Sequence, residues 1–185
     1  MMQEIKKEEN VIILDFLPNG YPSSESRRNF PVAQALGKTN LRLLELAPKK
    51  EATMQPGEEV YVGEGKREKI HHIIGKILYE KLTQTAISEL EVLIKKAISE
   101  KEEQFVSFFN TAGPINIRRH FLQLIPGIGK KHLTGIINER EKEPFKSFAD
   151  IKNRIKLIPS PEKLIFNRIM DELQGKDNYK LFTSQ

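Results

Sequence analysis

The chain has 185 residues, no cysteine and a formal net charge of +5. The lack of cysteine excludes a disulfide framework and a thiolate metal site, and it fits a cytoplasmic protein. No apolar run approaches the roughly 20 residues that span a bilayer, and residues 1–10 are charged and lack the apolar stretch of a secretory signal. We therefore expect a folded cytoplasmic protein without a membrane segment.

Positive charge is concentrated in the last part of the chain. From Gly113 to the end there are 14 Lys and Arg against 8 Asp and Glu, whereas the preceding 112 residues contain 16 against 17. Long-range attraction to a polyanion such as nucleic acid would therefore come from the C-terminal part. The same charges can serve solubility alone, so charge does not decide between the two interpretations.

Short apolar runs separated by turn residues predict five strands near the N-terminus. They are expected at residues 11–17, 32–36, 41–46, 60–62 and 70–78. Five strands of these lengths suit a small β-barrel of the oligonucleotide/oligosaccharide-binding (OB) type, and a partly open sheet would leave the same pattern.

The hydrophobic period changes at Thr83, after which apolar residues recur every three or four positions. This pattern predicts a helix from about residue 86 to residue 100, extended by an aromatic cluster at 105–109. Further helices are expected at residues 115–123, 130–140, 148–156 and 162–174. The predicted fold class is therefore α+β with two domains: an OB-like barrel (1–82), a connecting helical segment (83–112) and an all-α domain of tandem helical hairpins (113–185).

The C-terminal part contains a short internal repeat. Residues 124–130 (LIPGIGK) recur 33 positions later as residues 157–163 (LIPSPEK). Each copy is expected to connect two helices, so the repeat predicts two similar units that share one core.

The first copy of the repeat has the features of a phosphate-binding turn. Pro126 and Gly127 suit the second and third positions of a tight turn, and Gly129 has no Cβ to keep a ligand away. The first N–H groups of the following helix lack acceptors and lie at its positive end, so a phosphate above them would accept their hydrogen bonds. The predicted site consists of Pro126, Gly127, Ile128, Gly129, Lys130 and Lys131. The alternative is a plain turn whose glycines serve only geometry.

The segment Ile125-Pro126-Gly127-Ile128-Gly129 resembles the helix-hairpin-helix family, whose hairpin consensus is apolar-Gly-apolar-Gly, and residues 144–151 (PFKSFADI) resemble that family's lead-in to a second unit. Over its whole length the chain is similar to uncharacterised archaeal proteins that join an OB- or S1-like barrel to a tandem helix-hairpin-helix. The resemblance implies sequence-independent contacts from hairpin amides to phosphates, in some cases with a monovalent cation held by hairpin carbonyls. The second copy departs from the consensus, because Pro161 lacks an N–H and Glu162 would repel phosphate, so we expect it to be structural.

Residues outside the first hairpin are candidates for secondary nucleic-acid contacts. Additional nucleic-acid contacts are expected at three basic pairs: Arg27 and Arg28, Lys66 and Arg67, and Arg118 and Arg119. If the barrel is OB-like, Tyr61 or Tyr79 could stack on a base.

No side-chain metal site is expected. His71 and His72 are neighbours beside a strand, where they would face opposite sides and chelate poorly. His120 and His132 have no Cys or Asp companions, and the four aspartates show no converging pair of the kind that a two-metal nuclease needs.

These features together predict a non-catalytic nucleic-acid-binding protein that recognises backbone phosphate without sequence preference. RNA is slightly favoured over DNA, because OB- and S1-like barrels commonly bind RNA. No catalytic residue is predicted, and no cofactor apart from a monovalent cation at the first hairpin. Two alternatives remain open: a structure-specific nuclease or DNA-repair subunit, and a protein-interaction module.

Overall fold

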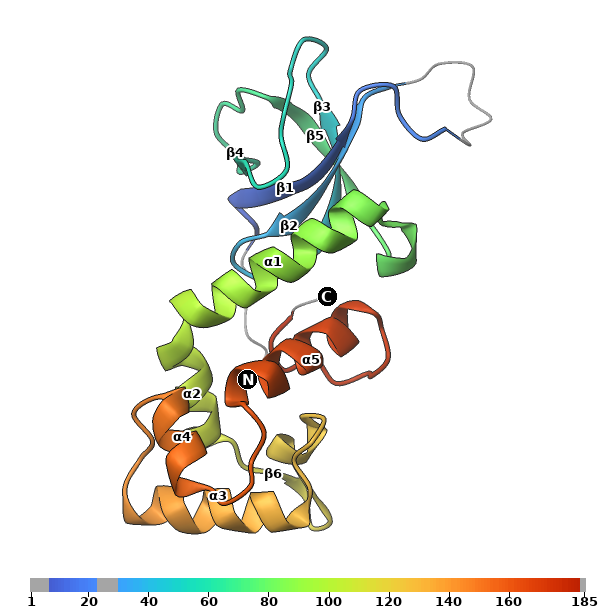
Figure 1. Cartoon of the computed structure of the whole chain (residues 1–185). Coiled ribbons are helices and arrows are strands. Elements are labelled where there is room, and N and C mark those ends of the chain that lie inside the picture. Colours follow the sequence, from blue (N-terminus) through green and yellow to red (C-terminus); the bar gives the residue numbers. More distant parts are fainter. Residues whose placement is uncertain (1–6, 23–29, 184–185) are drawn as a thin grey trace. The chain divides into compact units, whose positions relative to one another are not determined.

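The computed structural model describes residues 7–22 and 30–183 (Figure 1). The chain divides into two compact units, one of Met1–Leu93 with Glu172–Gln185 and the other of Ile94–Asp171. We call them the sheet unit and the helical unit. Helix α1 (Gln84–Glu100) starts in the sheet unit and ends in the helical unit, and α5 (Pro161–Leu173) runs from the helical unit into the sheet unit. The domain boundaries expected after residues 82 and 112 stay a prediction.

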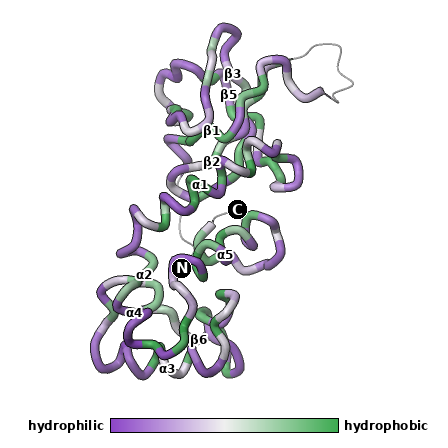
Figure 2. The backbone as a smooth tube through the Cα atoms, in the orientation of Figure 1, coloured by the Kyte–Doolittle hydropathy of each residue, from purple (hydrophilic) through white to green (hydrophobic). Residues whose placement is uncertain are grey.

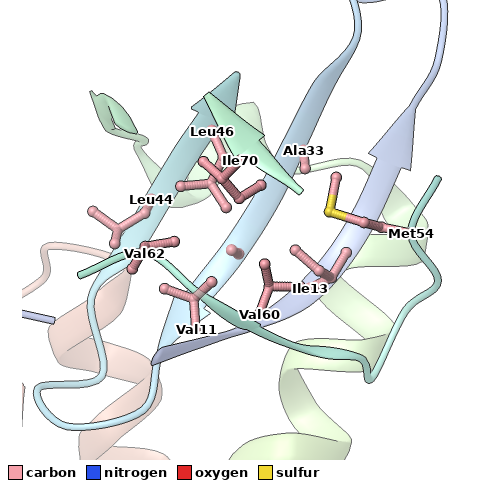
Figure 3. Close-up of a cluster of buried hydrophobic side chains, with 10 residues drawn as sticks. Val11, Ile13, Ala33, Leu44, Leu46, Met54, Val60, Val62 and Ile70 are labelled. Carbon is pink, nitrogen blue, oxygen red and sulfur yellow. The ribbon is translucent and has the colours of Figure 1, made fainter. Parts of the chain in front are cut away.

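The sheet unit is built on five antiparallel strands in the order β4-β1-β2-β3-β5. The strands are β1 (Asn10–Leu17), β2 (Val32–Gly37), β3 (Leu43–Pro48), β4 (Glu59–Tyr61) and β5 (Ile70–Lys76). Alternate side chains such as Val11 and Ile13 point into one buried cluster, which Figure 3 shows between the curled strands. Figure 2 shows the hydropathy along the chain: β1 and β2 are largely hydrophobic, and the connecting loops are largely hydrophilic.

A short polar network ties the start of α1 to the strands. The Thr83 hydroxyl donates to the Asp15 carboxylate at 2.6 Å, and the Thr83 N–H donates to the Gln34 side-chain oxygen at 3.0 Å. The Gln34 amide is fully buried and donates in turn to the Lys81 carbonyl, in the 3₁₀ turn η1 (Tyr79–Lys81), at 3.0 Å. Buried polar groups need such partners, so these bonds fix where α1 leaves the sheet.

The predicted closed OB-like barrel is wrong. β4 pairs with β1 and β5 pairs with β3, but no ladder joins β4 to β5 in the described part of the chain, so the sheet is a half-barrel with two free edges. β4 has only three residues, because turn segments around Gly57 and Gly63 limit it on both sides.

The helical unit combines helices with a small β-hairpin. Its elements besides the ends of α1 and α5 are α2 (Glu102–Thr111), β6 (Pro114–Asn116), β7 (Arg119–His120), the 3₁₀ turn η2 (Phe121–Leu124), α3 (Lys130–Lys142) and α4 (Phe148–Arg154). The core of this unit contains large side chains that are fully buried: Phe109, Leu122, Ile125, Ile136 and Ile151. Arg140 of α3 donates to the carbonyls of Phe109 and Ala112 at 2.9 and 2.8 Å, which satisfies the end of α2.

The predicted all-α tandem helix-hairpin-helix is therefore wrong as well. Residues 115–123, expected as a helix, form β6, β7 and η2. The Asn116 side chain accepts the Arg118 N–H at 2.9 Å, a local bond that competes with helical pairing. The first copy of the repeat consequently follows a 3₁₀ turn, whereas the second follows α4.

Within the described residues, no helix has both the length and the apolar composition required to cross a membrane.

Candidate functional site

The first copy of the repeat forms a tight turn between η2 and α3. The Ile128 N–H donates to the Ile125 carbonyl at 3.1 Å, and both of these apolar side chains are buried. Gly127 has a φ of +98°, and a Cβ built there would lie 2.8 Å from a methyl carbon of Leu164. Gly127 is thus glycine for reasons of backbone conformation and packing, as the turn pattern predicted.

Gly129 is different, because the fold does not require glycine there. It is the N-cap of α3, with φ −84° and ψ −179°, which is extended backbone that any residue adopts. A Cβ at this position would meet no atom within 4 Å. The missing side chain therefore leaves open space directly over the start of the helix.

The first turn of α3 presents unsatisfied N–H groups to that space. The first backbone hydrogen bond of the helix runs from the Leu133 N–H to the Gly129 carbonyl at 2.9 Å. Within the described part of the chain, the N–H groups of Lys130, Lys131 and His132 have no protein acceptor. The His132 ring Nδ1 lies 3.1 Å from the Gly127 carbonyl, and because a carbonyl only accepts, Nδ1 is the donor. This bond holds the first turn of the helix against the hairpin.

Lys130 and Lys131 are exposed, and among the described residues neither forms an ion pair. They occupy the positive end of α3, where a cation opposes the helix dipole. The carboxylates of α3 lie at its other end. Glu139 accepts from Lys142 at 2.6 Å, a hydrogen bond that lowers the pKa of this carboxyl below its ordinary value. The two lysines therefore oppose the dipole of the helix that they begin.

Negative charge is absent from the sequence around the turn. From residue 104 to residue 138 there is no Asp or Glu, although the chain has 25 acidic residues among 185. This interval includes β6, β7, η2, the turn and the first half of α3. A count of basic residues alone does not reveal this interval. The positions of the acidic residues do reveal it, and they can be read from the sequence.

The turn at the second copy of the repeat already contains a hydrogen-bond acceptor, the Ser160 hydroxyl, and a negative charge, the Glu162 carboxylate. The Ser160 hydroxyl donates to the Glu162 carboxylate at 2.6 Å and lies 3.4 Å from the Lys163 N–H. Pro161, the first residue of α5, has no N–H. Among the described residues, this turn thus has fewer free donors than the first, and its expected structural role stays a prediction.

The expected secondary residues belong to different parts of the chain. Arg27 and Arg28 lie outside the described residues. Lys66 and Arg67 belong to the sheet unit, where the Arg67 Nε donates to the Gly63 carbonyl at 2.8 Å and so holds its own turn. Arg118 and Arg119 are exposed in the β6–β7 hairpin, in the same unit as the first turn.

The side-chain orientation expected for His71 and His72 is wrong. Their Nδ1 atoms lie 2.8 Å apart on the exposed surface, because a register shift in the β3–β5 ladder interrupts the alternation of the strand. Two ligands do not make a metal site, and no group of three or more His, Cys, Asp or Glu side chains suited to a metal is found in the described part of the chain. Tyr61 is engaged with its own loop, since its hydroxyl accepts the Gly65 N–H at 3.0 Å.

Comparisons with known proteins identify the family. A family model described as "Protein of unknown function (DUF655)" matches residues 7–184. The uncharacterised protein MJ0038 of Methanocaldococcus jannaschii is 44% identical over 172 residues, which cover 92% of this chain and 77% of that protein. The crystal structure of Af1531 from Archaeoglobus fulgidus superposes with a TM-score of 0.82 at 41% identity, over 96% of this chain and all of the other. The chain belongs to the DUF655 family.

Proposed function

We propose that this protein binds nucleic acid in the cytoplasm and holds backbone phosphate at the turn formed by Ile125, Pro126, Gly127, Ile128 and Gly129 and the start of α3. The observation that carries the proposal is the open space over Gly129, bordered by N–H groups and by two lysines that have no partner among the residues that the structure describes. The local resemblance of this turn to a helix-hairpin-helix hairpin supports the same ligand.

Each part of the turn matches one property of a phosphodiester. The anionic oxygens accept hydrogen bonds from the N–H groups of Lys130, Lys131 and His132, as anions do at helix N-termini. The two ammonium groups add point charge at the same place. The phosphate that these donors would bind is common to every nucleotide, so the proposed recognition is independent of sequence. We therefore propose a binding role without catalysis, and a monovalent cation on the hairpin carbonyls remains part of the proposal.

The choice between RNA and DNA is open to measurement. The preference for RNA rested on a closed OB-like barrel, and the sheet is open. The phosphodiester is common to both polymers, and the turn has no group that identifies a 2′-hydroxyl. The proposal therefore concerns the phosphate backbone of either.

The test is fluorescence anisotropy of the full chain with end-labelled oligonucleotides of one length: single- and double-stranded RNA, and single- and double-stranded DNA. A turn that contacts three or four duplex phosphates should give a slope of log affinity against log salt of roughly −3 to −4. No salt-dependent binding to any of the four would overturn the proposal. The same samples, incubated with Mg²⁺ and run on a denaturing gel, should keep their length; cleavage products would show a nuclease instead.

A further inference from the structure

The β6–β7 hairpin carries an apolar residue at its tip. Ile117 is fully exposed and is the most exposed large apolar side chain among the described residues. Single exposed apolar residues are common and carry no meaning alone. Ile117, however, stands directly before two exposed arginines, Arg118 and Arg119, in the part of the sequence that has no Asp or Glu.

The hairpin is held in shape by several bonds. The Asn116 side chain accepts the Arg118 N–H at 2.9 Å, and the Phe121 N–H donates to the Gly113 carbonyl at 3.1 Å, which closes the base of the hairpin. Below the strands, the His120 side chain accepts the Leu122 N–H at 3.1 Å, and the Gln123 side chain accepts the His120 N–H at 3.0 Å. A preorganised projection of this kind loses little conformational entropy when its tip is inserted into a partner.

The hairpin belongs to the same framework as the proposed phosphate site. β7 and α3 both contact η2, which lies between them in the chain. Figure 1 shows the hairpin, labelled β6, in the yellow part of the ribbon that connects α2 to α3. A polyanion held at the start of α3 would therefore be bound by the unit that presents Ile117.

We propose that Ile117 is a wedge that inserts between adjacent bases of a nucleic-acid duplex, with Arg118 and Arg119 on the phosphates beside the opened step. The inference rests on the proposed function, since it needs nucleic acid on this unit. Apolar side chains such as Ile and Leu separate base steps in this way in proteins that bend or open a duplex, and insertion buries the apolar tip. The guanidinium groups suit phosphate, to which they can donate two parallel hydrogen bonds. Binding at the Gly129 turn needs no base contact, so the wedge adds a distinct activity: local opening of the stack.

The test uses the full chain and duplexes of DNA and of RNA that contain 2-aminopurine, whose fluorescence rises when the base is unstacked. Affinity is measured by anisotropy in the same titration. The variant is Ile117→Ser, and the matched control is Leu157→Ser, which removes another apolar side chain, 77% exposed, from the second turn of the same unit. Thermal melts establish that both variants are folded.

We expect wild type and Leu157→Ser to raise the fluorescence and Ile117→Ser to leave it low. Because the contact is apolar, Ile117→Ser should bind roughly 10-fold more weakly with an unchanged salt slope. If wild type binds without raising the fluorescence, or Ile117→Ser raises it as wild type does, the wedge is refuted while the phosphate site stands. Absence of binding by wild type would refute both.

Discussion

Replacing Lys130 and Lys131 with alanine separates a functional role of these lysines from a structural one. Both are in the first turn of α3, and neither has an ion-pair partner among the described residues. Each opposes the helix dipole by roughly 0.3–1 kcal/mol at low ionic strength. The double variant should therefore be more stable than wild type by about 0.6–2 kcal/mol, and alanine's higher helix propensity acts in the same direction.

The same double variant should bind nucleic acid more weakly than wild type. If each lysine contacts one phosphate, the slope of log affinity against log salt should become shallower by roughly one to two units. The loss of affinity relative to wild type then grows by about 10- to 100-fold for each ten-fold decrease in salt. Anisotropy titrations over a series of salt concentrations measure the slope, and urea unfolding of the same preparations measures stability.

Lys152→Ala with Lys156→Ala is the matched control. These lysines are exposed in the helical unit, and the control removes the same charge at a distance from the turn in sequence. Its salt slope should be closer to that of wild type than the slope of the Lys130 and Lys131 variant. Equal slopes in the two double variants would show that only net charge matters, and an unchanged slope at Lys130 and Lys131 would show that the hairpin is a plain turn. A marked loss of stability in that variant would contradict the dipole argument.

Four further predictions concern single residues. Gly127→Ala should destabilise the protein by about 1–2 kcal/mol or more in urea unfolding, because its φ is +98° and its Cβ would meet Leu164 at 2.8 Å; a midpoint equal to that of wild type would contradict the packing. Gly129→Val should leave the melting temperature unchanged and weaken nucleic-acid binding, and unaltered affinity would mean that phosphate does not approach this position. Glu162→Ala should leave binding unchanged or slightly stronger; a loss as large as that of the lysine variant would place the site at the wrong turn. Burial, and secondarily the charge of Arg140, lowers the pKa of His120, so its contribution to stability is present above about pH 6.5 and is lost as the pH falls toward its folded-state pKa. Urea midpoints across that window should fall in wild type and less in His120→Gln, and parallel curves would refute the assignment.

The elements that depend on local pattern were predictable from the sequence. Short apolar runs bounded by turn residues located the five strands, and the period of three to four located α1 and α3, because each pattern depends on a single element and its ends. The turn at Gly127 was also predictable, since proline fixes φ at one position and glycine permits a positive φ at the next. The hairpin of β6 and β7 was missed, because the Asn116 side chain that favours the turn acts through a hydrogen bond that periodicity does not detect.

Other features depend on contacts between distant segments and emerged only from the tertiary structure. Closure of the barrel requires β4 and β5 to pair across the sheet, and their separate pairings with β1 and β3 leave both edges free. The two glycines of the first turn look alike in sequence, but a Cβ at Gly127 would force Leu164, 37 positions further along the chain, to shift, whereas a Cβ at Gly129 would meet no described atom within 4 Å. Glu139 pairs with Lys142 and Arg154, whereas no carboxylate among the described residues pairs with Lys130 or Lys131, and such pairing is decided by which side chains meet in space. Residue type and spacing suffice for the local backbone, whereas the openness and the charge of a site depend on what the folded chain brings near it.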